Sequence, residues 1–425
     1  MLDRIGVSSV DDLFNEIPKE VVLSRDYDIP SEMSETELRK FFRSLADKNK
    51  SLTVFAGQGA YDHYSPSVVP HLLQRSEFYT AYTPYQPEIS QGTLQYIFEY
   101  QSMIAELTGM DCSNASMYDG ATATAETMFM MVASARKKNR VLLSATLPAR
   151  VLEVVETYAK FHGVELTVIP ENNGVTDLEA IPAELAKGDV AGMILPQPNR
   201  YGIIEDLTGV ADMLHGAKAL MAMNVDPSAL AVLRSPAEWG ADIACGDGQT
   251  LGMPLEFGGP YLGFIACSQS LLRKMPGRVV GVTRDADGKR AYVLTLQARE
   301  QHIRREKATS NICSNQSLMC LYAVIYLALM GTKGLEEVNE LSSDGAHYLF
   351  DRLVASGKYE AAFPGKPFLK EFVVKSKSPY APVKERLEKE GFMGGVEIAP
   401  DTVAIAVTEQ RSKEEIDRFV ELMTK

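Results

Sequence analysis

The stretch VLLSATLPARVLEVVETYAKFHGVELTVI, residues 141–169, contains one strand–helix–strand unit. Val141–Leu143 and Val164–Ile169 are short apolar runs typical of buried strands. Between them a helical pattern runs from Arg150 to His162, and Gly163 is the kind of residue that commonly ends a helix. Because such a helix carries the chain back across a sheet, the stretch predicts two parallel strands and a covering helix.

The same alternation continues on both sides of this unit. Helices are predicted from Ser90 to Gly109 and after Asp119-Gly120, and Asp287-Gly288 predicts a hairpin turn. We therefore expect an α/β fold with a mainly parallel sheet that is covered on both faces. Further strands are predicted at Val190–Leu195, Leu220–Val225, Ala241–Cys245 and Tyr261–Cys267, and the hairpin strands at Val279–Thr283 and Ala291–Leu294.

The two ends of the chain differ from this central part. Residues 1–89 are predicted to be an N-terminal arm with interface loops, and Ser34-Glu-Thr-Glu37 within them is a capping box at a helix start. Residues 90–312 form the predicted large domain. Residues 313–425 are predicted to hold a connecting helix and a small α/β domain. Its predicted elements are helices at Leu318–Met330, Leu335–Ser356, Val383–Glu390 and Lys413–Thr424, and strands at Glu371–Lys375 and Thr402–Thr408.

Composition argues against several classes of function. The formal net charge of −13 repels nucleic acid and anionic membranes. The most apolar run, Leu318–Met330, is shorter than the roughly 20 residues of a membrane span, and the N-terminus lacks the apolar core of a signal peptide. The five cysteines are odd in number and show no CxxC spacing, so neither a disulfide framework nor a zinc site is predicted. We expect a cytoplasmic protein without nucleic-acid, membrane or metal partners.

A large parallel-sheet domain followed by a small one resembles the layout of aminotransferase-like pyridoxal-phosphate enzymes of fold type I. Such an enzyme needs an anion site for the phosphate, an acid beside the pyridine nitrogen and a lysine for the Schiff base. The helix start at Asp119–Glu126 offers the first, because Gly120 exposes N–H groups and Thr122 and Thr124 add hydroxyls. The alternative is an ordinary helix start with small residues for close packing.

The acid is also present in the sequence. Asp226 follows the apolar run Leu220–Val225, and the carboxyl end of a strand is where open α/β sheets place their ligands. The alternative is a turn or helix cap for Pro227-Ser228.

The lysine is missing. No lysine occurs from Ala219 to Arg273, the interval in which the Schiff-base residue is expected. The residue nearest the expected place is Gln249, whose amide nitrogen is not nucleophilic. The scaffold is therefore suggestive, whereas the reactive group is absent.

Several segments together resemble the glycine decarboxylase P-protein family, in particular subunit 1 of its two-subunit form. The catalytic subunit of that family carries Asn-Leu-His-Lys-Thr and then a Gly-Gly-Pro turn; Gln249-Thr250 falls on Lys-Thr, and Asp226 falls on the pyridine-binding aspartate. The resemblance thins in the small domain. The matching segments are Ile5–Phe14, Thr83–Gly92, Tyr118–Glu126, Gly246–Thr250, Phe257–Gly263 and Arg304–Asn311.

The resemblance implies a chain that pairs with a lysine-bearing P-protein subunit 2, as a heterodimer that pairs further into a heterotetramer. It implies that pyridoxal phosphate is bound covalently by the partner, that glycine is decarboxylated there, and that the aminomethyl group passes to the lipoyl arm of H-protein. No catalytic residue is then expected in this chain, which would be inactive alone. Gly120, Thr122, Thr124, Asp226 and Gln249 would be a vestigial cofactor site.

The aromatic loop before residue 91 supplies the candidates for a wall of the partner's active site or for the subunit interface. Tyrosines offer apolar area with a polar tip, and Glu88 could bind an amine. The alternative is a packed loop in which Glu88 caps the helix that starts near Ser90. The candidates are Tyr82, Thr83, Tyr85, Gln86, Glu88 and Ser90.

Residues 304–311 hold a second polar group. The cluster Arg304-Arg-Glu-Lys307 could meet an acidic partner or a phosphate, although such runs are more often solvated faces. Thr309, Ser310 and Asn311 are expected to cap the helix after Cys313 rather than to reach an anion.

Two other functions fit the sequence. A pseudoenzyme scaffold or regulator of the same fold, with another partner, would also lack the lysine. An autonomous pyridoxal-phosphate lyase would need a lysine elsewhere, such as Lys307, which lies outside the strand-end position.

Overall fold

The computed structural model describes residues 1–135, 137–308 and 310–425, which form two compact units, Met1–Ser51 and Leu52–Lys425. The first unit contains α1 (Leu2–Ile5) and α2 (Glu35–Ala46), and none of its residues is buried. The predicted capping box is confirmed, because Ser34 and Glu37 each accept the other's backbone N–H. The predicted boundaries near 89 and 312 stay predictions, since 52–425 is one unit.

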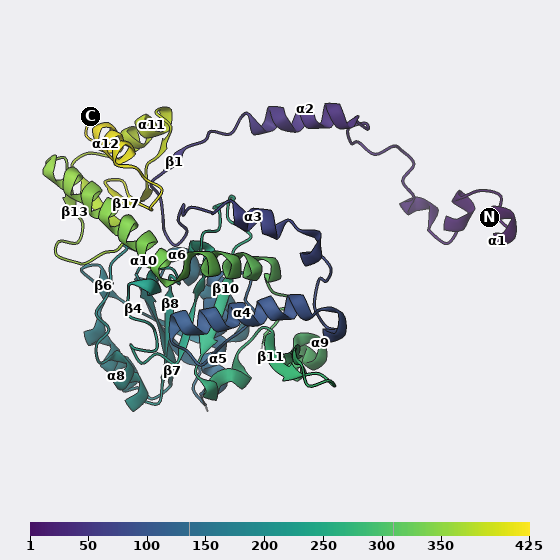
Figure 1. Cartoon of the computed structure of the whole chain (residues 1–425), viewed down its shortest axis with the longest axis horizontal. Coiled ribbons are helices and arrows are strands. Elements are labelled where there is room, and N and C mark those ends of the chain that lie inside the picture. Colours follow the sequence, from purple (N-terminus) through teal and green to yellow (C-terminus); the bar gives the residue numbers. More distant parts are fainter. Residues whose placement is uncertain (136, 309) are drawn as a thin grey trace. The chain divides into compact units, whose positions relative to one another are not determined.

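A seven-stranded sheet forms the centre of the second unit (Figure 1). Its order is β2-β10-β9-β8-β7-β3-β4, and β4, β3, β7, β8 and β9 run parallel, whereas β10 is antiparallel to both of its neighbours. The predicted mainly parallel sheet is therefore confirmed. Its strands are β2 (Cys112–Ser113), β3 (Arg140–Ser144), β4 (Glu165–Ile169), β7 (Val190–Gln197), β8 (Leu220–Val225), β9 (Ile243–Asp247) and β10 (Gly263–Cys267).

Both faces of this sheet are covered, as the alternation of side chains along a strand requires. In β3, Leu142 packs into the core under α4 and α10, while Val141 and Leu143 pack into the core under α5 and α6. α4 and α10 lie side by side (Figure 1). The helices of this unit up to α10 are α3 (Val68–Leu73), α4 (Gln91–Thr108), α5 (Gly120–Ser134), α6 (Ala149–His162), α7 (Ile181–Leu185), α8 (Val210–Gly216), α9 (Gln301–Arg304) and α10 (Ser317–Ala355).

α10 joins the two helices predicted at Leu318–Met330 and Leu335–Ser356. Gly331, at φ 60° and ψ −173°, breaks the helical geometry between them. By length and composition α10 is apolar enough to cross a membrane. The segment before the break, however, has a length of only about 21 Å, against about 30 Å of bilayer hydrocarbon. Its residues Leu321 and Tyr326 belong to the protein core, so a buried helix accounts for its composition.

The C-terminal part has its own four-stranded sheet, in the order β13-β14-β17-β16 with antiparallel pairing. α11 and α12 pack on it around a third core that contains Phe372 and Phe419. The strands β13, β15 and β16 were not predicted. The remaining elements are β1 (Thr53–Val54), β5 (Glu171–Asn172), β6 (Val175–Thr176), β11 (Val279–Arg284), β12 (Arg290–Thr295), β13 (Tyr359–Ala361), β14 (Glu371–Ser376), α11 (Ala381–Lys389), β15 (Phe392–Met393), β16 (Val396–Ala399), β17 (Thr402–Ala406) and α12 (Lys413–Met423).

Candidate functional site

A cleft of about 370 Å³ lies at the carboxyl ends of β8 and β9, beside the N-terminus of α5. This is the place where open α/β sheets bind ligands. Gly120 and Asp226, two of the predicted site residues, line it. Other lining residues come from distant parts of the chain, namely Tyr61 from the loop after β1 and Glu371 from β14.

Two N–H groups at the start of α5 are held by the chain's own carboxylates. Gly120 donates its N–H to Asp247 Oδ2 at 2.8 Å, and Thr122 donates to Asp119 Oδ1 at 2.8 Å. The Thr124 hydroxyl donates to the carbonyl of Gly120. Burial raises the pKa of the Asp247 carboxyl, and N–H groups donated to it oppose the rise. These contacts fit the alternative of an ordinary capped helix start rather than an open phosphate site.

Asp226 is paired with a lysine that directly precedes β14 of the small sheet. Lys370 Nζ lies 2.7 Å from Asp226 Oδ2, and its side chain is 2% exposed. Burial opposes ionisation of Asp226, but Lys370 outweighs it and holds the pKa of Asp226 below its ordinary value. Asp226 Oδ1 also accepts the N–H of Ser228, so the predicted turn cap is present. The position beside Asp226 that a pyridinium nitrogen would need is therefore held by an ammonium.

The ion pair continues into a buried chain of polar groups. Lys370 Nζ lies 3.0 Å from His63 Nε2, and His63 Nδ1 lies 2.7 Å from Glu409 Oε2. Burial, and then the charge of Lys370, lowers the pKa of His63, so the neutral ring bridges the two charged neighbours. Lys370 also lies 4.4 Å from the centre of the Tyr61 ring.

Gln249 is fully buried and its amide is used by the backbone. Its Oε1 accepts the Tyr61 N–H at 2.8 Å, while its Nε2 donates to the carbonyl oxygens of Tyr61 at 2.8 Å and Met253 at 2.7 Å. The side chain thus joins the end of β9 to the loop after β1. This loop is also held by Glu371, which accepts the N–H of Gln58 and the hydroxyl of Tyr61. Burial raises the pKa of Glu371 to about 7.

The comparisons with known proteins show the family of the chain. The family described as glycine cleavage system P-protein matches residues 1–423. The chain belongs to this family. It is 52% identical to the probable glycine dehydrogenase (decarboxylating) subunit 1 of Moorella thermoacetica, over 100% of this chain and 96% of that relative. A crystal structure of glycine decarboxylase (P-protein) of the glycine cleavage system, in inhibitor-bound form, superposes with a TM-score of 0.94 at 40% identity, covering 100% of this chain and 96% of that one.

The predicted fold class is also confirmed. An alanine–glyoxylate aminotransferase from Nostoc superposes with a TM-score of 0.63 at 16% identity, covering 89% of this chain and 95% of that one. At this identity the match shows the fold alone. The P-protein chain is therefore an aminotransferase-like, fold type I protein.

The fold's cofactor does not fit the residues of this cleft. Pyridoxal phosphate would need the Gly120 N–H that Asp247 accepts and the Asp226 carboxylate that Lys370 pairs with. Gln249 offers no amine, and the described hydrogen bonds of its side chain are all to backbone. Among the residues that the structure describes, no group of three His, Cys, Asp or Glu side chains is placed to hold a metal ion.

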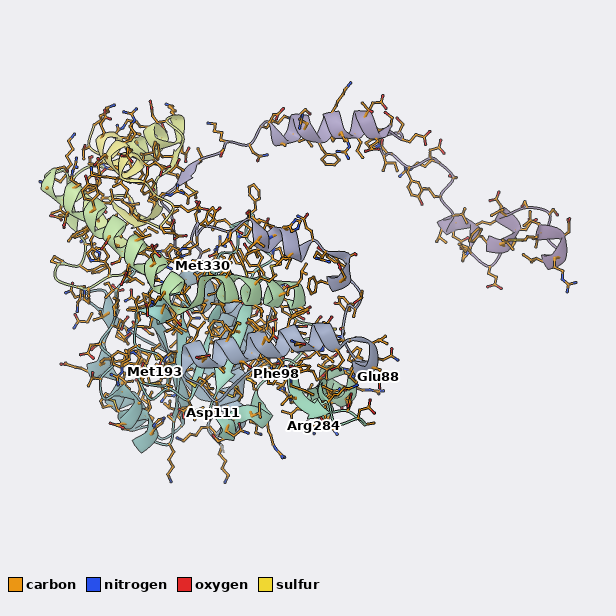
Figure 2. The ribbon with its side chains drawn as sticks, in the orientation of Figure 1. Glu88, Phe98, Asp111, Met193, Arg284 and Met330 are labelled. Carbon is orange, nitrogen blue, oxygen red and sulfur yellow. The ribbon has the colours of Figure 1, made fainter. Side chains whose placement is uncertain are left out.

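The candidates of the aromatic loop lie outside this cleft. Tyr82 is 83% exposed and Tyr85 is 49% exposed, and Glu88 lies at the surface beside the start of α4 (Figure 2). Gln86 is exposed and Thr83 is half-buried, whereas Ser90 is buried. The N-cap residue of α4, Ser90, has no side-chain cap hydrogen bond, and the role of Glu88 stays a prediction.

The second polar group is also at the surface. Residues 304–307 are exposed, as expected for a solvated face. α10 begins at Ser317 without a side-chain cap, so the expected capping by Ser310 and Asn311 is wrong; Ser310 donates instead to Glu126. Thr309 lies outside the described residues.

Sequence reasoning missed Lys370, Asp247 and Glu371. Asp247 is the last residue of β9 and lies two residues after the predicted strand Ala241–Cys245. An acid at the end of a predicted strand was therefore a signal that could have been used. Lys370 and Glu371 lie more than 140 residues after Asp226, in another sheet, and no local pattern marks them.

Proposed function

We propose that this chain is the lysine-less subunit of a two-subunit glycine decarboxylase and holds no cofactor of its own. It pairs in the cytoplasm with a lysine-bearing P-protein subunit 2, and two such pairs form the tetramer. That partner decarboxylates glycine with pyridoxal phosphate and passes the aminomethyl group to the lipoyl arm of H-protein. The cofactor, when bound there, withdraws the electron pair released as glycine loses CO₂.

The observation that carries the proposal is that polar groups lining the cleft are engaged by other groups of the same chain. Asp247 supplies an anion at the start of α5, Lys370 supplies a cation at Asp226, and Gln249 takes the lysine position. The chain's own groups thus contact the residues that would otherwise bind the phosphate and the pyridine nitrogen of the cofactor, and a glutamine replaces the lysine. A chain that keeps the fold but engages the lining groups of its cleft in this way acts through its surfaces rather than through chemistry of its own.

Two exposed regions support a partner-binding role. In α2 of the first unit, Leu38, Phe41, Phe42 and Leu45 recur at helical spacing and are all exposed. An apolar face of this kind is favourable only when another surface covers it. The aromatic loop is the second region, and we propose that Tyr82 and Glu88 contribute to the partner's active site or to the subunit interface.

The first test compares the chain with and without the lysine-bearing subunit. We expect no visible imine absorbance and no glycine–bicarbonate exchange from this chain alone with added pyridoxal phosphate, and both signals from the pair. Exchange by the isolated chain would contradict the proposal. Failure to restore exchange by a subunit that does assemble would favour the alternative of a scaffold or regulator for another partner.

The second test concerns the aromatic loop. We expect Tyr82→Ala and Glu88→Gln to lower turnover of the reconstituted pair at least tenfold while assembly stays intact. Tyr79→Ala, also at an exposed tyrosine, is the matched control. Unchanged turnover in both variants with intact assembly would refute the role of this loop.

The remaining alternative, a lyase that uses Lys307, has little structural support. Lys307 is exposed and is not among the residues that line the cleft. A yellow isolated chain whose absorbance disappears in Lys307→Ala would favour it.

A further inference from the structure

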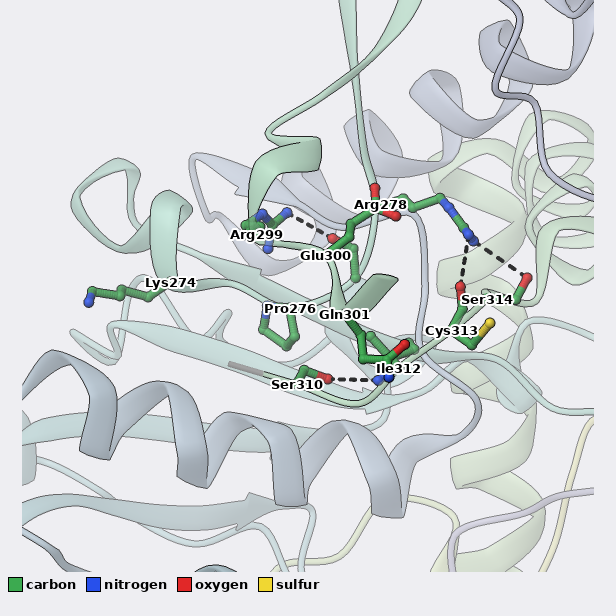
Figure 3. A pocket seen from close by; sticks show the side chains of 11 residues that line it. Lys274, Pro276, Arg278, Arg299, Glu300, Gln301, Ser310, Ile312, Cys313 and Ser314 are labelled. Atoms are coloured by element: carbon green, nitrogen blue, oxygen red, sulfur yellow. Dashed lines mark hydrogen bonds between the residues drawn. The ribbon is translucent and has the colours of Figure 1, made fainter. Parts of the chain in front are cut away.

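A second, smaller pocket lies between the base of the β11–β12 hairpin and the segment 310–314 (Figure 3). Its volume is about 30 Å³, which is room for one or two waters or for the charged group of a small anion. It shares no lining residue with the large cleft. The side chains that matter here are Arg278, Arg299, Glu300 and Ser314.

Arg299 has far more hydrogen-bond donors than acceptors. A guanidinium carries five N–H groups. The described acceptor for Arg299 is the carbonyl of Gly277, 2.8 Å from Nη2, and its Nε is buried without a partner. Burial lowers the pKa of Arg299, which reports the cost of keeping this charge out of water.

Arg278 lies on the other side of the pocket and is 6% exposed. Its good hydrogen bond goes to the carbonyl of Cys313 at 2.8 Å, and the bonds to Tyr85, Ser314 and Asn315 are 3.3–3.5 Å long. All of these acceptors are uncharged, and its Nε is also buried without a partner. The second guanidinium is therefore held in place but not neutralised.

The pocket has an excess of positive charge. Glu300 is the one carboxylate among its lining residues; it lies 3.5 Å from His302 Nδ1, and its charge opposes the lowering of the pKa of Arg299. Within the described ranges, neither guanidinium forms an ion pair with a carboxylate. Burying a charge is costly, and one carboxylate cannot balance two guanidinium groups, so the pocket is suited to an anion.

We propose that this pocket binds the head of an oxyanion, a carboxylate or a phosphate group, between Arg278 and Arg299. The planar fork of a guanidinium matches two oxygens of such a group, which chloride cannot offer. The Ser314 hydroxyl, which accepts from Arg278, keeps its own proton for a further oxygen. The pocket is open to solvent, so only the head enters and the rest of the ligand stays outside. The proposal does not depend on the proposed function.

The test uses the full chain, with sodium phosphate and sodium formate as probes at constant ionic strength set by chloride. Binding is followed by calorimetry and by the rise of the thermal unfolding midpoint. We expect saturable binding of at least one probe, weakened at least tenfold in Arg299→Gln and less in Arg299→Lys, which keeps the charge but loses the fork. The matched control is Arg284→Gln, an exposed arginine of the same hairpin that bonds the Gly288 carbonyl (Figure 2).

Binding of phosphate alone assigns the pocket to phosphate groups, and binding of formate alone assigns it to carboxylates. The proposal is overturned if neither probe binds saturably, or if Arg299→Gln and Arg284→Gln bind like the unchanged chain. Circular dichroism of each variant in chloride checks that it is folded. If Arg299→Gln is unfolded, Arg278→Gln provides a second variant.

Discussion

Placing a lysine at residue 249 tests the reasoning about the engaged polar groups of the cleft. In Gln249→Lys, the ammonium can still donate to the carbonyls of Tyr61 and Met253, but the Tyr61 N–H loses its acceptor and faces a positive charge. An unsatisfied buried N–H costs about 1–3 kcal/mol, and a buried ammonium without an acid costs several more. We therefore expect the free energy of unfolding to fall by at least about 4 kcal/mol.

The same variant should not gain a cofactor, because Asp247 and Lys370 still fill the two ends of the site. Urea unfolding measures the stability, and visible absorbance with added pyridoxal phosphate, followed by borohydride reduction and mass spectrometry, measures imine formation. Gln74→Lys, at an exposed glutamine, gives the background from surface lysines. The reasoning is refuted if Gln249→Lys unfolds at the original urea concentration and carries the reduced cofactor on residue 249.

Three further predictions follow from the structure. Lys370→Met leaves Asp226 buried and unpaired, so the free energy of unfolding in urea should fall by about 3–5 kcal/mol. Adding Asp226→Asn should largely restore it, and additive effects of the two substitutions would contradict the ion pair. The pKa of Glu371 is about 7 when folded and near 4.5 when unfolded, so this group's contribution to stability falls as pH rises from about 4.5 to 7. Glu371→Gln should accordingly gain up to about 3 kcal/mol relative to the unchanged chain between pH 5 and pH 8, and a gain that does not depend on pH would argue against it. Phe41→Asp in α2 should leave the unfolding of the isolated chain unchanged but should weaken pairing with the lysine-bearing subunit at least tenfold, as measured by calorimetry. The control Lys40→Asp, on the polar face of α2, should leave pairing unchanged. Equal pairing by both variants would contradict docking of this face.

The central sheet was predictable because its signals are local. The strand–helix–strand stretch at residues 141–169 forms β3, α6 and β4 with bounds close to those predicted, and Gly163 ends α6 in the left-handed conformation. Apolar runs and helix-ending glycines act within a few residues of where they occur. The short strands β13, β15 and β16 carry no such signal, since their pairing partners are supplied by the tertiary fold.

The sequence by itself determined that this protein lacks the Schiff-base lysine. One residue type at one position, Gln249, excludes a Schiff base there, and this holds in any conformation. Only the tertiary structure decided what replaces the lost chemistry. It brings Lys370, the residue before β14, to Asp226. It places the Asp247 carboxylate at the start of α5, and it bonds the Gln249 side chain to the loop at Tyr61. Those contacts join residues up to 188 positions apart. A charged residue has no special signal in the sequence, but once it is buried it needs a partner, because an unpaired buried charge is costly.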